Sequence, residues 1–182
     1  MHKAVYWIIG ILLAHALILY FLGQPPICEC GYVKFWEGHV FSQGNSQHIA
    51  DWYTFSHVIH GLLFYALAKF LFPKAPFAVR LLLAVGIESA WEVTENTPMV
   101  INHYRQQALA VGYVGDSVLN SFMDAIWMIV GFFLASRLPV WVSVGLMVAM
   151  ELLVLYFIRD NLTLNIINLI HPFEFINKWQ VK

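Results

Sequence analysis

Apolar stretches of bilayer-spanning length dominate this chain and limit the folds that are open to it. A helix needs roughly 20 apolar residues to cross the hydrocarbon core of a bilayer. Stretches of about that length recur between short polar connections. We therefore predict an all-α, polytopic membrane bundle of about five transmembrane helices, formed by residues 4–22, 52–72, 77–96, 116–136 and 140–158. Residues 1–182 would form one integral membrane domain.

The composition supports this fold class and argues against a nucleic-acid-binding protein. Hydrophobic residues make up 60% of the chain and charged residues 12%, whereas soluble domains carry roughly a quarter charged residues. The formal net charge is -1, so the basic excess typical of nucleic-acid partners is missing. We expect the lipid bilayer as the partner, and no nucleic acid.

Three further segments complete the predicted architecture. Residues 23–50 form a polar loop rich in Gly and Pro, too short for a domain and expected to be ordered over the helix ends. Ile166 to Trp179 is apolar but interrupted by Pro172, which indicates an interfacial segment and not a further span. The first apolar stretch lacks a small-residue cleavage site, so we expect a retained anchor and not a signal peptide.

Acidic residues form a stripe at the end of the third predicted span. Glu88, Glu92 and Glu95 are spaced i, i+4 and i+7, so on a helix their carboxylates project from one face. A charge at the centre of a membrane helix costs about 2.5 to 3.5 kcal/mol on the insertion scale. Three such groups therefore require partners, protons or a bound cation.

Polar side chains on the neighbouring spans are placed to meet this stripe. His57 and His60 lie early in the second span, and Asp116 and Asp124 lie early in the fourth. Because alternate spans run in opposite directions, the polar halves of all these helices must lie at one end of the bundle. Imidazole and carboxylate ligands together suit Zn or Mn. We predict a divalent metal held by His57, His60, Glu88, Glu92 and Asp124.

Three functions fit this pattern, and the sequence leaves them open. In the first, a metal-dependent hydrolase or transferase acts on a lipid or lipid-linked substrate, with Asp116 or Glu95 as general base. In the second, the same groups bind or carry a cation, a proton or a small molecule without turnover. In the third, the polar face docks another membrane protein during assembly. Without a metal, the polar side chains would satisfy one another across the helices.

The two cysteines and the distribution of basic residues add two expectations. Cys28 and Cys30 are two apart in the polar loop, where they could bind a soft metal with His39 or His48, cycle as a thiol pair, or form a local loop feature. By the positive-inside rule, the basic residues in the short turns place that end in the cytoplasm. We predict an inner-membrane protein whose N-terminus is cytoplasmic and whose polar site faces the periplasm or exterior.

Several short motifs resemble a family of uncharacterised bacterial multi-pass inner-membrane proteins. They are Cys28-x-Cys-Gly31, Asn45-Ser-Gln-His48, Asp51-Trp-Tyr-Thr54, Ser56-His57-x-x-His60-Gly61, Trp91-Glu-Val93, Glu95-Asn-Thr-Pro98, Gly115-Asp-Ser117, Asn120-Ser121, Arg137-Leu-Pro139 and Arg159-Asp-Asn-Leu-Thr-Leu-Asn165. The resemblance covers essentially the whole chain and implies a location rather than an activity.

A second resemblance is looser and covers spans two to four. The order of a His-Gly helix, an acidic helix, and a helix with Gly-Asp, a second Asp and Gly131 is similar to VanZ-like membrane proteins, which are associated with glycopeptide resistance. The Cys-x-Cys loop and Trp91-Glu92 depart from that pattern. The resemblance therefore does not carry an activity to this chain.

Overall fold

The computed structural model describes residues 2–181 and is helical throughout its regular structure. The predicted boundaries of the long helices agree with it to within two residues. The elements are α1 (His2–Phe21), α2 (Thr54–Leu71), α3 (Phe77–Glu95), α4 (Pro98–Tyr104), the 3-10 helix η1 (Ala108–Ala110), α5 (Val118–Arg137), α6 (Val140–Ile158), α7 (Leu162–Ile170) and α8 (Glu174–Gln180).

Within residues 2–181, four helices are long and apolar enough to cross a membrane. They are α1, α2, α5 and α6. Helix α3 has comparable length, at 19 residues, but it carries Arg80 and three glutamates. Charge and not length therefore separates α3 from the other long helices. The all-α class is confirmed, and a fifth membrane crossing stays a prediction.

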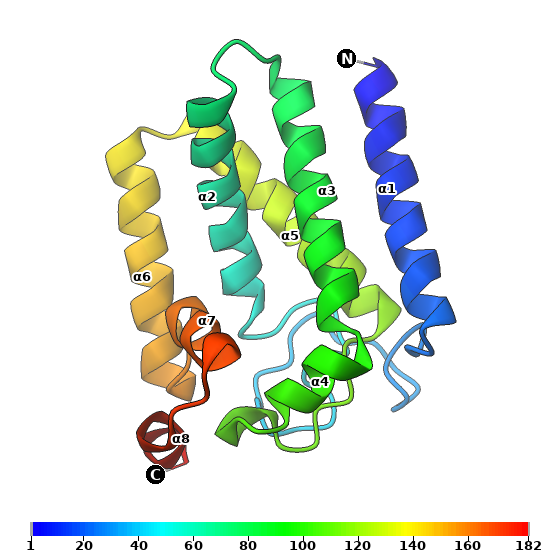
Figure 1. Ribbon diagram of the computed structural model, residues 1–182, viewed down its shortest axis with the longest axis vertical. Helices are drawn as coiled ribbons and strands as arrows, with labels where there is room; N and C mark the ends of the chain where they lie inside the picture. Colours follow the sequence, from blue (N-terminus) through cyan, green and yellow to red (C-terminus); the bar gives the residue numbers. More distant parts are fainter. Residues whose placement is uncertain (1, 182) are drawn as a thin grey trace.

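The five long helices run alternately up and down (Figure 1). The turns between α2 and α3 and between α5 and α6 lie at the same end as the N-terminus. The loop after α1, helix α4 and the C-terminal helices α7 and α8 lie at the opposite end. The prediction that the polar helix ends gather at one end of the bundle is thereby confirmed.

Close contact between α2 and α5 is the main packing interaction of the bundle. It depends on two glycines, because a Cβ on Gly61 would lie 2.0 Å from the carbonyl oxygen of Met128, and a Cβ on Gly131 would lie 2.0 Å from that of Val58. Small residues allow helix backbones to approach this closely. A second pair forms where α1 packs along α3, and the buried Val85 and Phe132 belong to the core between the pairs.

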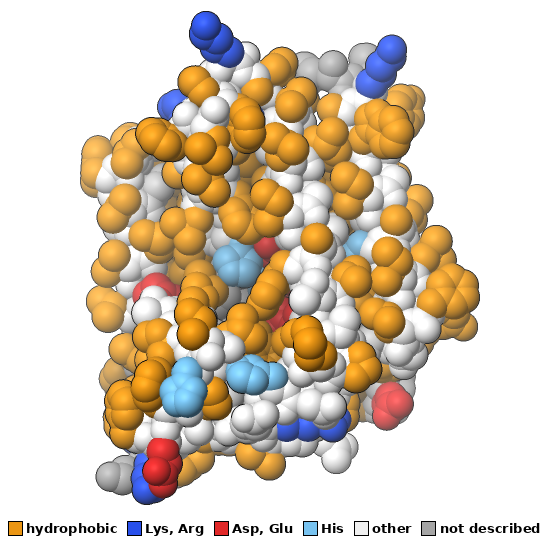
Figure 2. Space-filling model, viewed as in Figure 1, with side chains coloured by type: hydrophobic (Ala, Val, Ile, Leu, Met, Phe, Trp, Pro, Cys, Tyr) orange, Lys and Arg blue, Asp and Glu red, His pale blue; other side chains and the backbone are white. Residues whose placement is uncertain are grey.

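The outer surface of the bundle is apolar. Large hydrophobic side chains are exposed on all five long helices, including Trp7, Phe70, Ile87, Phe133 and Tyr156. Figure 2 shows hydrophobic side chains covering most of the visible face, with Lys and Arg side chains near its ends. This distribution is the one expected of helices that face lipid.

The polar loop after α1 is ordered by contacts with the start of α5, as predicted. The backbone N–H groups of Val118 and Leu119 donate to the carbonyl oxygens of Pro25 and Pro26. The Asn120 amide donates to the carbonyl oxygen of His48 at 2.8 Å. The loop therefore lies as a fixed cover over the polar end of the bundle.

The connection after α3 and the segment after α6 contain short helices. Pro98, expected only to end the third span, also begins α4, because its ring fixes φ for a first helical turn and its missing N–H is not needed there. The C-terminal segment is interrupted around Pro172, as predicted, and forms α7 and α8.

Asp160, between α6 and α7, connects the C-terminal segment to the start of α2. Its buried carboxylate accepts hydrogen bonds from Tyr53, Asn165 and Gln180, and burial raises the pKa of this carboxyl to about 7.

Replacing either contact glycine with alanine should destabilise the bundle. Gly61→Ala and Gly131→Ala each place a methyl group against backbone atoms, and overpacking of this kind costs about 1–3 kcal/mol or more. The midpoint of thermal unfolding in detergent measures the loss. Gly145→Ala is the matched control, because a Cβ there meets no atom within 4 Å. Equal midpoints for the contact and control variants would contradict the packing described here.

Candidate functional site

The histidines of α2 meet Glu88 of α3 inside the bundle. His57 and His60 are one turn apart on α2, so both rings point to the same side. Nδ1 of His57 lies 2.7 Å from Glu88 Oε1, and Nδ1 of His60 lies 3.1 Å from Glu88 Oε2. Glu88 is fully buried. An ionised carboxylate only accepts hydrogen bonds, so both histidines donate to it through Nδ1, and a neutral ring then keeps the Nε2 lone pair for a metal.

The His57 ring also lies near a second group of carboxylates. Its Nε2 lies 3.8 Å from Oδ2 of Asp124 on α5, and its Nδ1 lies 3.3 Å from Oε1 of Glu92, one turn after Glu88 on α3. His57, Glu92 and Asp124 each offer one possible metal-ligand atom, and these three atoms lie within 4.8 Å of one another. Helices α2, α3 and α5 therefore each supply a possible metal ligand at the same place.

Helix α1 also reaches this group. The Ser121 hydroxyl donates to Glu92 Oε2 at 2.5 Å. Its oxygen then accepts from Nε2 of His15, at 2.9 Å, because the hydroxyl has only one proton to give. His15 is buried. The hydrogen bonds fix the orientation of Glu92 and connect the first helix to the cluster.

Glu95 and Asp116 lie at the polar edge of the cluster. Ligand atoms of Glu92, Glu95 and Asp116 come within 4.8 Å of one another. Asp116 is held firmly, since its carboxylate accepts hydrogen bonds from Asn96 at 2.7 Å and Tyr113 at 2.8 Å. Its backbone N–H donates in return to Asn96 Oδ1 at 2.7 Å. This reciprocal pair joins the end of α3 to the start of α5.

The cluster has more acidic groups than basic partners. Within residues 2–181, no Lys or Arg side chain forms an ion pair with Glu88, Glu92 or Asp124, whose close ionisable neighbours of basic type are the histidines. Glu92 Oε1 and Asp124 Oδ1 are buried with no hydrogen-bond partner in that part of the chain. Buried polar atoms normally have a hydrogen-bond partner. Two carboxylate oxygens that lack one, close to histidines, are therefore suited to bind a cation.

A cavity of about 1560 Å³ reaches the cluster. Its polar lining includes His57, His60, Glu88, Glu95 and Asp124. Its lining also includes the apolar side chains of Leu63, Phe64, Ile87, Trp91, Ile166 and Leu169. Figure 2 shows a hollow between α2 and α3 in which His and acidic side chains are visible between hydrophobic ones.

This lateral opening follows from the packing of the bundle. Helix α2 packs mainly on α5, and α3 packs mainly on α1, so α2 and α3 touch less extensively. Leu63 and Ile87, which line the cavity from either side, are both also exposed on the outer surface. The site is therefore accessible from the apolar flank of the protein as well as from its polar end.

The structure brings together all seven residues that were predicted as a site. His57, His60, Glu88, Glu92, Asp124, Glu95 and Asp116 form the three overlapping groups described above. Their assignment as metal ligands and general bases stays a prediction. Sequence reasoning missed the parts played by His15, Asn96, Tyr113 and Ser121. A single histidine in an otherwise apolar helix was the one available sign of His15.

Comparison with known proteins assigns the chain to a family. Residues 19–182 match the family described as "Protein of unknown function (DUF2585)". The chain belongs to this family. A UPF0314 protein of Rhizobium meliloti is 52% identical over 181 residues, covering 98% of this chain and 92% of the relative. One from Sinorhizobium fredii is 54% identical over 177 residues, covering 96% and 90%.

A further relative comes from another bacterium, and the names of these relatives assign no activity. A UPF0314 protein of Sphingopyxis alaskensis is 50% identical over 165 residues, covering 91% of this chain and 88% of the relative. No solved structure matches the chain. The expected membership in an uncharacterised bacterial family is confirmed. The looser similarity to VanZ-like proteins is not shown by these matches and stays a hypothesis.

Loss of the Asn96 side chain should loosen the polar end of the bundle. Asn96→Ala leaves the buried Asp116 N–H and one carboxylate oxygen without their partner, at a cost of about 1–3 kcal/mol. Thermal unfolding in detergent measures this cost. Asn102→Ala serves as the control because Asn102 is exposed on α4. If both variants unfold at the same temperature, the reciprocal pair does not hold α3 to α5.

Proposed function

We propose that this chain is a membrane-embedded, metal-dependent hydrolase or transferase that acts on a lipid or lipid-linked substrate. The observation that carries the proposal is the cluster of histidines and carboxylates with two buried, unpartnered carboxylate oxygens. Such groups inside a bundle of apolar helices are costly unless they serve a purpose. A divalent ion, Zn or Mn by the donor types, would offset their charge.

The geometry favours a division of roles among the predicted ligands. His57 Nε2 and Asp124 Oδ2, 3.8 Å apart, can share one ion that lies about 2 Å from each. Glu92 belongs to the same group of ligand atoms as His57 and Asp124 and completes a mixed nitrogen and oxygen set, to which His60 would have to be drawn from its neighbouring group with His57 and Glu88. Glu88 already accepts from Nδ1 of both histidines, as the carboxylates that orient metal-bound histidines do. Glu88 can instead bind directly, since it forms a ligand group with His57 and His60.

Once bound, the metal would polarise the scissile group and lower the pKa of a water molecule toward neutrality. Glu95 and Asp116 are the candidate proton acceptors. Both Asp116 oxygens already accept hydrogen bonds, whereas Glu95 is partly exposed and lines the cavity. Glu95 is therefore the better placed of the two to take a proton from an attacking water or hydroxyl.

The class of substrate follows from the mixed lining of the cavity. A molecule with a polar, anionic or ester head and an apolar tail matches a lining that combines His, Glu and Asp with Leu63, Phe64, Ile87 and Leu169. If the apolar helices span the inner membrane, such a molecule can enter sideways between α2 and α3. With the polar end facing the periplasm, lipid-linked envelope precursors are within reach.

Metal content is the direct test of this proposal. We expect about one or more tightly bound divalent ions per detergent-purified chain, by elemental mass spectrometry after metal-replete expression. His57→Ala/His60→Ala should lose them, and the exposed His39→Ala should keep them. A well-folded wild-type protein without metal would instead favour a protonated His57 bridging the carboxylates, and transport or partner docking over hydrolysis.

The proposed roles of Glu88 and Asp124 separate by affinity. Asp124→Asn removes a direct ligand and should abolish stoichiometric metal binding. Glu88→Gln leaves one oxygen that can accept from the Nδ1 atoms of His57 and His60 where Glu88 has two. It should weaken metal affinity by about 10- to 100-fold, the usual cost of losing a group that orients the ligands. Competition with a chelator of known affinity measures both. Complete loss with Glu88→Gln and none with Asp124→Asn would reverse the assignment.

A further inference from the structure

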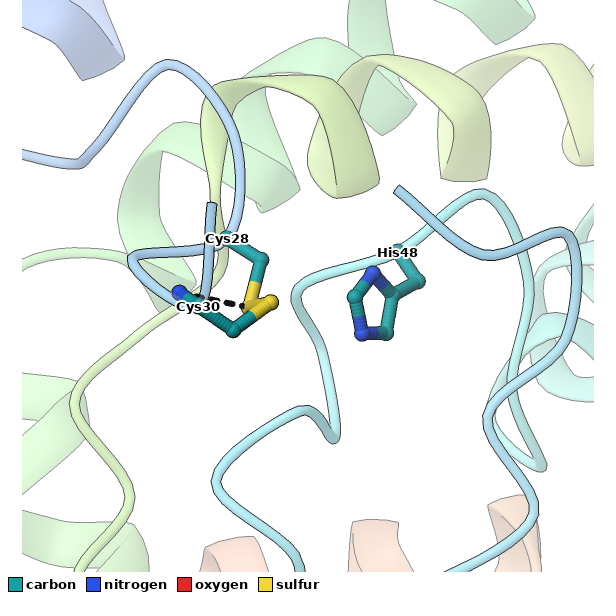
Figure 3. A group of neighbouring side chains, drawn as sticks. All are labelled: Cys28, Cys30 and His48. Carbon is teal, nitrogen blue, oxygen red and sulfur yellow. Dashed lines mark hydrogen bonds between the residues drawn. A yellow bond between two sulfur atoms is a disulfide. The ribbon is translucent and has the colours of Figure 1, made fainter. Parts of the chain in front are cut away.

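The cysteine pair forms a second chemical feature, which lies outside the bundle cluster but lines the same cavity. Cys28 and Cys30 are joined by a disulfide in the loop that follows α1, which resolves part of the choice left open by the sequence. Cys28 is buried and Cys30 is exposed. Figure 3 shows the imidazole of His48 beside the two sulfurs, and these three ligand atoms lie within 4.8 Å of one another.

Stabilisation of the fold explains this disulfide poorly. In the chain-entropy account, a disulfide stabilises a fold by closing a loop, and the effect shrinks as the loop becomes shorter. Here the two cysteines are separated by two positions, which is close to the smallest loop that a disulfide can close. The surrounding loop is already held by the hydrogen bonds from Val118, Leu119 and Asn120.

The surroundings of Cys28 suit a sulfur that leaves as a thiolate. The backbone N–H of Cys30 donates to Cys28 Sγ at 3.2 Å (Figure 3). N–H donors to sulfur favour the thiolate and lower the pKa of the thiol. Cys30 is by contrast open to attack, because its side chain is on the surface.

His48 lies beside the cysteine pair and is held in one tautomer. Its ring stacks on Tyr32, with 5.7 Å between ring centroids. The backbone N–H of Lys34 donates to its Nδ1 at 3.3 Å, so the neutral ring carries its proton on Nε2. That buried Nε2 has no hydrogen-bond partner among residues 2–181. Burial lowers the pKa of His48, which keeps the ring neutral near pH 7.

From this geometry we infer that the Cys28–Cys30 disulfide is a thiol–disulfide exchange site that accepts electrons from a dithiol. A thiolate of the dithiol attacks Cys30 Sγ, forming a mixed disulfide and releasing Cys28 as a thiolate near the Cys30 N–H and His48. The second thiolate of the dithiol then attacks its own sulfur in the mixed disulfide and releases Cys30. The dithiol is oxidised to a disulfide, and the cysteine pair takes up two electrons and two protons.

Reduction of the folded protein tests the inference independently of any metal in the bundle. Detergent-purified protein is equilibrated with ratios of reduced and oxidised dithiothreitol, and free thiols are alkylated and counted by mass. We expect both cysteines to become alkylated without denaturant and to re-form the disulfide when the ratio is reversed. A pair that is reduced only after unfolding would overturn the inference. So would a reduced pair that resists alkylation until a chelator is added, since it would then be a metal site.

Single-cysteine variants test which sulfur is attacked. Cys28→Ser leaves the exposed thiol and Cys30→Ser leaves the buried one. With an aromatic disulfide reagent, we expect Cys28→Ser to react at least about tenfold faster, since access controls thiol exchange. Equal rates in the two folded variants, or a faster Cys30→Ser, would overturn the assignment of Cys30 as the attacked sulfur.

In this scheme His48 is a positioning residue that favours the thiolate of Cys28. The pKa of the Cys28 thiol therefore measures its contribution. The charged groups facing His48 are Glu37, with Oε2 at 4.0 Å from Nε2, and Lys34, which is paired with Glu37 at 2.7 Å. In Cys30→Ser, adding His48→Phe keeps the stacked ring and removes the N–H. We expect the Cys28 pKa to rise by about one unit, a tenfold loss of thiolate near neutral pH. His39→Phe is the control, and an equal shift there, or none with His48→Phe, would remove His48 from the scheme.

Discussion

The contact between His57 and Glu88 is the interaction around which the bundle is organised. Its 2.7 Å separation brings a fully buried carboxylate of α3 against α2, which is itself locked to α5. Removing one partner from a buried pair of this kind leaves an uncompensated charge, which costs more than the pair gains. The polar groups of three helices must therefore stay in register, and the acidic stripe that made α3 the least apolar of the long helices determines where α3 sits.

The sequence predicted the helices and the polar cluster because both rest on simple periodicities. Long apolar stretches are recognisable by length, and Glu88, Glu92 and His57 could be placed on helix faces before any tertiary contact was known. Alternation of direction then put the polar ends together. What could not be predicted depends on neighbours distant in sequence. Helix α4 is too short to have a clear pattern, and His15 gains its role only through Ser121, 106 positions later.

The loop after α1 shows the same limit for irregular structure. Its composition and length predicted an ordered segment over the helix ends that is neither a helix nor a domain, but not its conformation. Its actual form depends on backbone hydrogen bonds to the start of α5 and on the burial of His48 and Asp51. Burial raises the pKa of the Asp51 carboxyl, although backbone N–H groups of Ser46 and Tyr53 donate to it. The cover of the site is thus as specifically built as the helices below it.

The division of the bundle into two tightly packed pairs gives the cluster a mechanical property. Backbone contact at Gly61 and Gly131 joins α2 and α5 into one closely packed pair, and α1 with α3 forms another. His57, His60 and Asp124 belong to the first pair, and Glu88 and Glu92 belong to the second. A shift of one pair along the other would therefore alter all the distances between imidazole and glutamate together. The cluster links the two helix pairs where α2 meets α3. A molecule that separates these two helices from the side would lengthen the contacts between the histidines and the glutamates.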